Sequence, residues 1–111
     1  MHELSICTAI AAIVGEHADG RPVDRVRIDV GALRQVVPDT LVYSWEVTVD
    51  GTPLAGSVLE VHEIPAVLAC DDCGARTTIT LPVFRCPCGS TATTAVSGHE
   101  LLVTSLELCP A

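Results

Sequence analysis

The chain has 111 residues, and 49% of them are hydrophobic although it holds only one Phe, one Tyr and one Trp. This length suits one ordinary domain, or a small domain with a metal-stabilised module, and it excludes a large enzyme. Fourteen acidic residues against six basic ones give a net charge of −8, which opposes binding to nucleic acid and to anionic membranes.

The first segment is predicted to form a helix from Glu3 to about Ala18, because Ile6, Ile10 and Val14 recur at helical spacing. His2 is then expected just outside the helix start. No Lys or Arg precedes the apolar run and no cleavage site follows it, so it does not resemble a signal peptide, and it is too short to cross a bilayer. We therefore expect a cytoplasmic protein with reduced cysteines.

Two segments alternate as strands do. In "VDRVRIDVG" (23–31), Val26, Ile28 and Val30 share one face, and "SVLEVHEI" (57–64) alternates Leu59 and Val61 with polar residues. Near the C-terminus, "ELLVTSLEL" (100–108) resumes a strand-like pattern with Leu102, Leu106 and Leu108 on one face, so the chain is expected to return to the sheet that it left.

The segment "VPDTLVYSWEVTVDG" (37–51) has two interpretations. Leu41, Trp45 and Val49 would share one face of a helix, and a proline near the start suits the first helical turn. Tyr43, Trp45, Val47 and Val49 also alternate as in a strand. The local pattern alone leaves the choice open, and the following Asp-Gly ends the element in both cases.

Residues 66–96 form a separate module, rich in Cys, Thr, Gly and Pro. Cys70 and Cys73, followed by Gly74, have the form of a zinc knuckle, and Cys86 and Cys88 supply a second turn. Four thiolates make a closed tetrahedral zinc site, which would replace a hydrophobic core in so small a module. The sequence therefore predicts a structural zinc ribbon.

The second turn departs from the usual pattern, because Cys86 and Cys88 are separated by one residue instead of two. The turn is expected to be tighter, with amide donation to sulfur partly lost. The alternatives are a three-cysteine site completed by His99 or Cys109, a pair prone to form a disulfide, or a decayed site.

Other candidates have structural interpretations. Cys7 lies on the apolar stripe of the first helix and is expected to be a small buried hydrophobe. His17 falls in the last helical turn, where a cationic side chain is favoured, and His62 is expected to face solvent from a strand. We find no phosphate loop, serine elbow or His-Glu-x-x-His motif, and a closed zinc site has no open position for substrate. The chain is not predicted to be an enzyme.

The first residues combine the Met1 amine, the His2 imidazole and the backbone nitrogens between them. Such fused chelate rings of nitrogen ligands suit Ni(II) or Cu(II), and metal binding must displace protons from them. Taken alone, this pattern favours a solvated terminal histidine.

Together these features resemble the HypA family of hydrogenase nickel-incorporation proteins. The resemblance rests on the opening "MHELSIC", the strand "RVRIDVGAL", the passage "GTPLAGSVLEVHEIPAVLACDDCG", and "FRCPCGS" followed by Gly98-x-Glu100-Leu101. It implies an α+β fold in which two helices pack on a small sheet, residues 1–65 with 97–111, and carry an inserted zinc module, residues 66–96. It also implies that residues 39–49 are helical.

The resemblance implies that Met1, His2 and Glu3 bind nickel, while zinc is held by the four cysteines, Cys70, Cys73, Cys86 and Cys88. It further implies a metallochaperone that delivers Ni(II) for maturation of [NiFe]-hydrogenase. Its partners would be a HypB-type GTPase and the hydrogenase large subunit, or urease maturation proteins. We expect a monomer or a weak dimer.

Two other hypotheses compete with the nickel carrier. The first is a zinc-ribbon adaptor that binds a partner protein and never transfers nickel. The second is a redox sensor that releases zinc when the second cysteine pair forms a disulfide.

Overall fold

The computed structural model describes residues 2–109, except for the side chain of His2, and the chain forms two compact units. The first, called the helical unit, comprises the residues up to 29, 36–62, and those from 102 onward. The second, called the cysteine unit, comprises residues 30–35 and 63–101. The expected zinc module, residues 66–96, lies within the cysteine unit, which also includes residues 30–35, 63–65 and 97–101.

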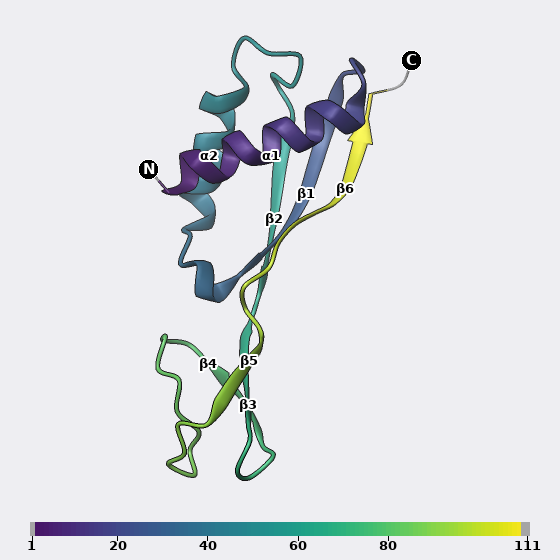
Figure 1. Cartoon of the computed structure of the whole chain (residues 1–111). Helices are drawn as coiled ribbons and strands as arrows, with labels where there is room; N and C mark the ends of the chain where they lie inside the picture. Colours follow the sequence, from purple (N-terminus) through teal and green to yellow (C-terminus); the bar gives the residue numbers. More distant parts are fainter. Residues whose placement is uncertain (1, 110–111) are drawn as a thin grey trace. The chain divides into compact units, whose positions relative to one another are not determined.

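The helical unit contains two helices and a three-stranded sheet, which confirms the predicted α+β class (Figure 1). The helices are α1 (His2–Ala18) and α2 (Pro38–Val49). The sheet has the order β2-β1-β6, formed by β2 (Val58–Ile64), β1 (Val23–Gly31) and β6 (Leu101–Leu108). The chain therefore returns to its first sheet after the cysteine module, as predicted.

Helix α1 begins at His2, one residue earlier than predicted, so His2 belongs to the helix. The helix ends where Asp19 (φ 50°) and Gly20 (φ 79°) adopt left-handed backbone conformations. No helix within the described range is long and apolar enough to span a membrane.

The segment that the sequence left undecided is helix α2. Leu41, Trp45 and Val49 are buried on one face, while Tyr43 and Val47 are exposed on the other. Helical spacing buries all three large apolar residues together, whereas a strand would have placed Leu41, Trp45 and Val49 on the same face as the exposed Tyr43 and Val47.

The core of the helical unit is built from aliphatic side chains around one tryptophan. Trp45 is fully buried, and its indole N–H donates a hydrogen bond of 3.0 Å to the hydroxyl of Ser57, which is itself buried. Cys7 is also fully buried, and its thiol lies 3.4 Å from the Leu41 carbonyl oxygen. The prediction that Cys7 packs as a small hydrophobe is confirmed.

Strand β6 is less buried than its apolar pattern indicated. Leu102, Leu106 and Leu108 were predicted to share one face, but Leu102 is 56% exposed and Leu106 and Leu108 are only half-buried. β6 lies at the edge of the sheet, where one side of the strand has no neighbour in the sheet.

The cysteine unit contains a second three-stranded sheet of order β4-β3-β5. Its strands are β3 (Ala66–Cys70), β4 (Arg76–Ile79) and β5 (Thr93–Ser97), and both pairings are antiparallel. A short 3-10 helix, η1 (Ala32–Arg34), accompanies them.

Two glycines within the cysteine unit allow a close backbone approach. A Cβ atom added to Gly31 would lie 2.0 Å from the Gly98 carbonyl oxygen, and Gly98 has a φ of +115°. The Gly31 amide donates to the Glu100 carbonyl and the Leu33 amide to the Gly98 carbonyl, each at 2.8 Å. Both glycines belong to motifs that carried the family resemblance, and their contact gives a physical reason for them.

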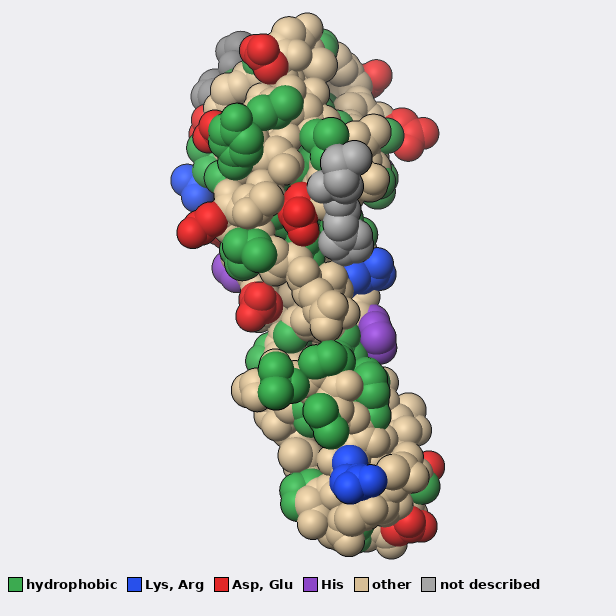
Figure 2. Space-filling view, turned by 90° about the vertical axis from the view of Figure 1, so that its left-hand side faces the viewer, with side chains coloured by type: hydrophobic (Ala, Val, Ile, Leu, Met, Phe, Trp, Pro, Cys, Tyr) green, Lys and Arg blue, Asp and Glu red, His purple; other side chains and the backbone are tan. Residues whose placement is uncertain are grey.

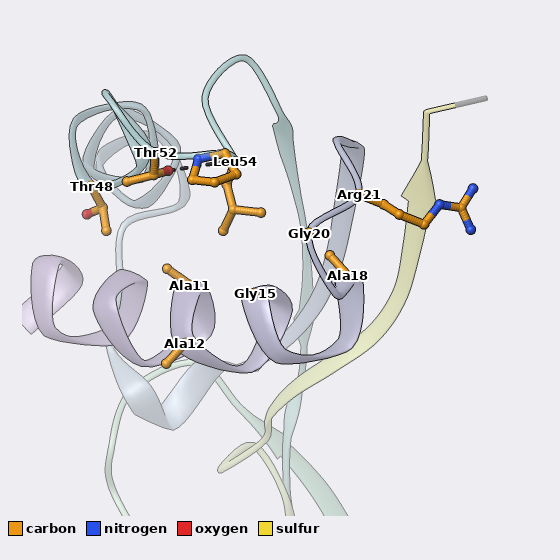
Figure 3. Close-up of a pocket in the computed structure, with 10 residues that line it drawn as sticks. Ala11, Ala12, Gly15, Ala18, Gly20, Arg21, Thr48, Thr52 and Leu54 are labelled. Carbon is orange, nitrogen blue, oxygen red and sulfur yellow. Dashed lines mark hydrogen bonds between the residues drawn. The ribbon is translucent and has the colours of Figure 1, made fainter. Parts of the chain in front are cut away.

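The helical unit also contains an apolar cavity of about 360 Å³ (Figure 3). Small residues of α1 and the turn after α2 line it, among them Ala11, Gly15, Ala18 and Leu54, and the Leu54 amide donates to the Thr52 hydroxyl. Among the described residues, no Asp, Glu, His or Cys lies in its lining, so these residues offer no group for metal binding or acid–base chemistry.

Candidate metal centre

The first cysteine turn follows directly from β3. Cys70 is the last residue of that strand, and its amide donates to the Ala75 carbonyl while the Gly74 amide donates to the Cys70 carbonyl. Gly74 has a φ of 74°, which glycine adopts without steric cost. The Cys73 amide lies 3.5 Å from the Cys70 sulfur. The turn thus holds two thiols on one side, as the knuckle spacing predicted.

The shorter second turn is closed by its own hydrogen bonds. The Cys86 amide donates to the Ser90 carbonyl, and the Gly89 amide donates to the Cys86 carbonyl at 2.8 Å. Gly89 has a φ of 95°. One residue fewer between the cysteines therefore still leaves a regular turn, with Cys86 buried and Cys88 exposed.

A side-chain contact joins the two turns. The Ser90 hydroxyl donates to the carboxylate of Asp72, and the Ala92 amide donates to the Ser90 hydroxyl. Sequence reasoning missed this link, although Asp and Ser next to paired cysteines are residues that often accept or donate bonds in turns. The link helps to keep the two cysteine pairs facing each other.

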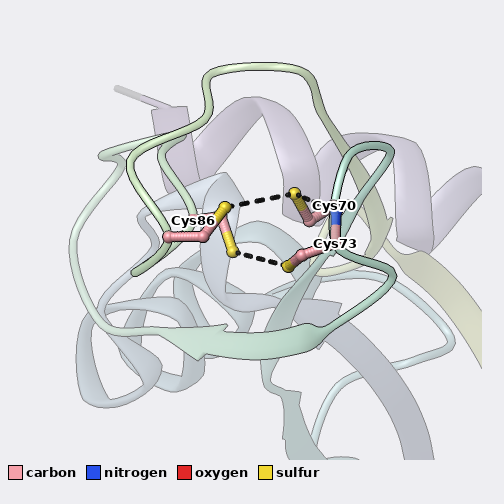
Figure 4. Close-up of side chains that lie close together, drawn as sticks. Cys70, Cys73 and Cys86 are labelled. Carbon is pink, nitrogen blue, oxygen red and sulfur yellow. Dashed lines mark hydrogen bonds between the residues drawn. The ribbon is translucent and has the colours of Figure 1, made fainter.

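The four thiols meet in a single cluster (Figure 4). Sulfur atoms lie 3.8 Å apart between Cys70 and Cys88 and 3.5 Å apart between Cys73 and Cys86, and all four lie within 4.8 Å of one another. A tetrahedron with Zn–S distances of about 2.3 Å has S–S edges of about 3.8 Å. The donor atoms and their spacing therefore fit a tetrahedral zinc ion.

The protein environment acts unequally on the thiols. The Cys73 backbone amide is the main cause that lowers the pKa of Cys70 to about 7. The Cys88 amide also lowers the pKa of Cys86, but burial and hydrogen bonds with the other three thiols raise it to about 12. A cation is therefore needed to hold all four groups as thiolates.

The alternative ligands named from the sequence do not join this cluster. Within residues 2–109, Cys70, Cys73, Cys86 and Cys88 form the one group of three or more metal-binding side chains whose ligand atoms converge. Neither the exposed His99 nor the half-buried Cys109 belongs to this group. All six cysteines are free thiols.

The N-terminal candidates are only partly described. Met1 and the side chain of His2 lie outside the described residues. Glu3 is half-buried in the first turn of α1. The backbone of His2 is the start of that helix, and the first N–H groups of a helix have no intrahelical acceptor.

The remaining histidines have local partners. A ring nitrogen of His17 lies 2.9 Å from the Ile13 carbonyl at the end of α1. His62 is exposed, and its ring lies 2.7 Å from the carboxylate of Glu60. Both structural interpretations of these histidines agree with the contacts.

A charge network on the sheet was not anticipated. Arg27 lies between Glu60 of β2, at 2.8 Å, and Glu107 of β6, at 2.6 Å, and Arg25 pairs with the same two carboxylates. The hydrogen bond from His62, followed by those from the two arginines, lowers the pKa of Glu60 to about 2. Alternating charges in "RVRID" signalled a polar face, but only strand pairing selects the partners.

Comparison with known proteins adds an independent observation. A family model described as "Hydrogenase/urease nickel incorporation, metallochaperone, hypA" matches residues 1–108. The hydrogenase maturation factor HypA of Nostoc sp. is 38% identical over 97% of this chain and 96% of its own length. The protein of the same name from Chloroflexus aurantiacus is 44% identical, over 96% of this chain and 98% of its own.

Solved structures show the same fold. The solution structure of the Ni metallochaperone HypA from Helicobacter pylori superposes with a TM-score of 0.69 and covers 97% of both chains at 23% identity. A second solution structure of a HypA protein has a TM-score of 0.68 at 24% identity. At these identities the comparison concerns the fold alone.

Proposed function

The chain belongs to the HypA family of hydrogenase and urease nickel-incorporation metallochaperones, and from that premise we propose that it binds Ni(II) at its N-terminus and delivers it for maturation of a [NiFe]-hydrogenase. Proteins of this family are maturation factors and not enzymes. The observation that carries the proposal is the family match, which runs from residue 1 to residue 108. The matched range includes Met1 with its amine, His2 with its imidazole and Glu3 with its carboxylate.

The start of α1 supports this nickel site. The amides of His2 and Glu3 lie in the first helical turn, where N–H groups have no intrahelical acceptor, so they are available to lose protons and bind the metal. The positive end of a helix dipole disfavours a cation. Deprotonated amides and the Glu3 carboxylate would offset that effect, which explains why nitrogen and carboxylate donors occur together here.

The charge of the helical unit also favours a cation as cargo. It carries ten of the fourteen Asp and Glu residues but only three arginines. Two of those, Arg25 and Arg27, are already paired with carboxylates. The resulting negative potential raises the local concentration of metal ions near the unit.

In this proposal zinc has a structural role. Cys70, Cys73, Cys86 and Cys88 would hold the ion, and the spacing of their sulfur atoms fits it. When bound, zinc supplies folding free energy that the small cysteine unit lacks. The proposed recipients are a HypB-type GTPase and the hydrogenase large subunit, or urease maturation proteins, in the cytoplasm.

Calorimetric titration with Ni(II) tests the nickel site. Three proteins are compared at equal zinc content: the chain beginning at Met1, the His2→Ala variant, and a chain with one extra residue before Met1. We expect strong binding only in the first, because the site needs both the free amine and the imidazole. Equal affinity in all three would exclude the N-terminal site.

The zinc-ribbon adaptor remains a second candidate, favoured by exposed apolar side chains on the cysteine unit. It predicts one zinc per chain, no specific nickel binding, and a partner complex that is insensitive to His2→Ala. Redox sensing predicts zinc release at mild oxidant levels, and retention of zinc under those conditions would argue against it.

A further inference from the structure

Strand β4 leaves one edge of the second sheet unpaired. The sheet order is β4-β3-β5, so β4 pairs with β3 on one side only within the described residues. The Cys70 amide donates to the Ala75 carbonyl, and Ala69 pairs with Arg76. Since bonded and non-bonded pairs alternate in an antiparallel ladder, the backbone N–H and C=O groups of Arg76 and Thr78 point away from β3.

A shallow groove lies where β4 ends, next to the start of β3 and η1. Two adjoining cavities of about 260 and 140 Å³ share Ala32, Ala66, Ile79 and Thr80 in their linings. Thr78 and one carboxylate, Glu63, line the larger one. The groove is therefore partly apolar and adjoins the end of β4. The free edge of β4 itself suits an extended chain, whose backbone would bond to the outward-pointing groups.

The loop after β4 extends the apolar surface. Leu81, Val83 and Phe84 are 68%, 60% and 46% exposed. Three such side chains within four residues expose apolar surface whose contact with water is unfavourable. Figure 2 shows hydrophobic side chains gathered on one face of this unit, close to an arginine.

Two arginines near the β4 edge indicate the charge of the ligand that this surface would bind. Arg76 at the start of β4 and Arg85 after the loop are both exposed, and within residues 2–109 neither forms an ion pair or a side-chain hydrogen bond. Arg25 and Arg27, by contrast, are fully paired with carboxylates. One unpaired cation precedes the edge strand and the other follows the apolar loop, so the two complement a ligand with acidic residues at its ends, while Glu63 in the groove disfavours acidic residues at its centre.

We propose that the β4 edge and the loop Thr80–Arg85 dock an extended segment of a partner protein, with apolar side chains at alternate positions and Asp or Glu at its ends. The segment would add to the sheet as a fourth strand, antiparallel or parallel to β4. This surface lies in the cysteine unit and uses no nickel ligand, so the proposal does not depend on nickel transfer.

The test uses the zinc-loaded full chain and two synthetic peptides, EVTVTVE and KVTVTVK, capped at both ends. Amide chemical shifts are followed by NMR. We expect the acidic peptide to shift the amides of Arg76, Thr78 and the loop, and the basic peptide to bind more weakly. Arg85→Glu is expected to reduce or reverse the preference for the acidic peptide over the basic one.

Two substitutions of Thr78 distinguish strand addition from nonspecific binding of the peptide to exposed apolar side chains. Thr78→Pro removes an outward N–H without removing a bond to β3, so binding is expected to weaken about fivefold, the effect of one lost hydrogen bond. Thr78→Val keeps the N–H and is expected to bind like the wild type. Phe84→Ser, which removes apolar surface, is also expected to weaken binding.

Three results would overturn the proposal: equal binding of the two peptides, no effect of Thr78→Pro, or the same shifts appearing with rising protein concentration in the absence of peptide. The last result would assign the surface to a second copy of the chain. Nickel calorimetry on the same samples is independent of all three, so failure here leaves the proposed function standing.

Discussion

Replacing Gly31 with alanine would place a methyl group inside a backbone contact of the cysteine unit. The added Cβ would lie 2.0 Å from the Gly98 carbonyl oxygen and 2.5 Å from the His99 amide nitrogen. Non-bonded heavy atoms prefer separations of about 3.5 Å. The two segments would therefore have to move apart by more than an ångström, and both contacts are to backbone atoms that cannot rotate aside.

Moving the two segments apart costs free energy through overpacking and through lost hydrogen bonds. Overpacking costs about 1–3 kcal/mol. The displacement also breaks the hydrogen bonds from the Gly31 amide to Glu100 and from the Leu33 amide to Gly98, each worth about 1 kcal/mol. We expect Gly31→Ala to lower the free energy of unfolding by about 3–5 kcal/mol, a large part of the stability of a small protein.

Amide hydrogen exchange of the zinc-loaded protein measures this loss of stability locally. The amide to follow is that of Leu33, whose N–H makes one of the affected hydrogen bonds. Gly15→Ala is the matched control, because nothing lies within 4 Å of a Cβ at that helical position. Alanine there should stabilise the helix by about 0.5–1 kcal/mol. A loss below about 1 kcal/mol for Gly31→Ala would refute the close approach of the two glycines.

Other predictions concern zinc, charge and the core. Cys88→Ser is expected to lose zinc to a chelator at neutral pH, whereas Cys109→Ser retains one zinc per chain, as metal analysis would show. Folding lowers the pKa of Glu60 to about 2 from 4.5, chiefly through the hydrogen bond from His62. The stabilisation is complete above pH 4.5 and is lost as the pH falls toward 2. Glu60→Gln should therefore flatten the pH dependence of stability in that range, as urea unfolding followed by tryptophan fluorescence would reveal. Leu41→Ala, at a fully buried position, should cost about 2–5 kcal/mol in the same assay, and a smaller loss would contradict the packing of α2.

The cysteine cluster was accessible from the sequence because its geometry is largely local. Cys70 and Cys73 share one turn, as do Cys86 and Cys88, and Gly74 marks the first turn. That these two turns face each other was an expectation from zinc chemistry, and the convergence of the four sulfur atoms bears it out. The bridge between Asp72 and Ser90 had no comparable sequence signal, since neither spacing nor composition pairs them.

Helix α2 shows where the local pattern is insufficient. Leu41, Trp45 and Val49 fit one face of a helix, and Trp45 and Val49 also fit a strand with Tyr43 and Val47. Burial against α1 decides between them, because only the helix hides all three large side chains and leaves the other two in water. That information lies in the rest of the chain and not in the segment.

The sequence by itself determined the apolar periods of α1 and β1, the cysteine spacing and the family, because each depends on residues close together in the chain or on their order along it. Only the tertiary structure decided that Gly31 touches Gly98, that Arg27 lies between Glu60 and Glu107, and that β4 keeps a free edge. These features join residues far apart in the sequence. Strand pairing and chain crossing select such partners, and no local propensity encodes them.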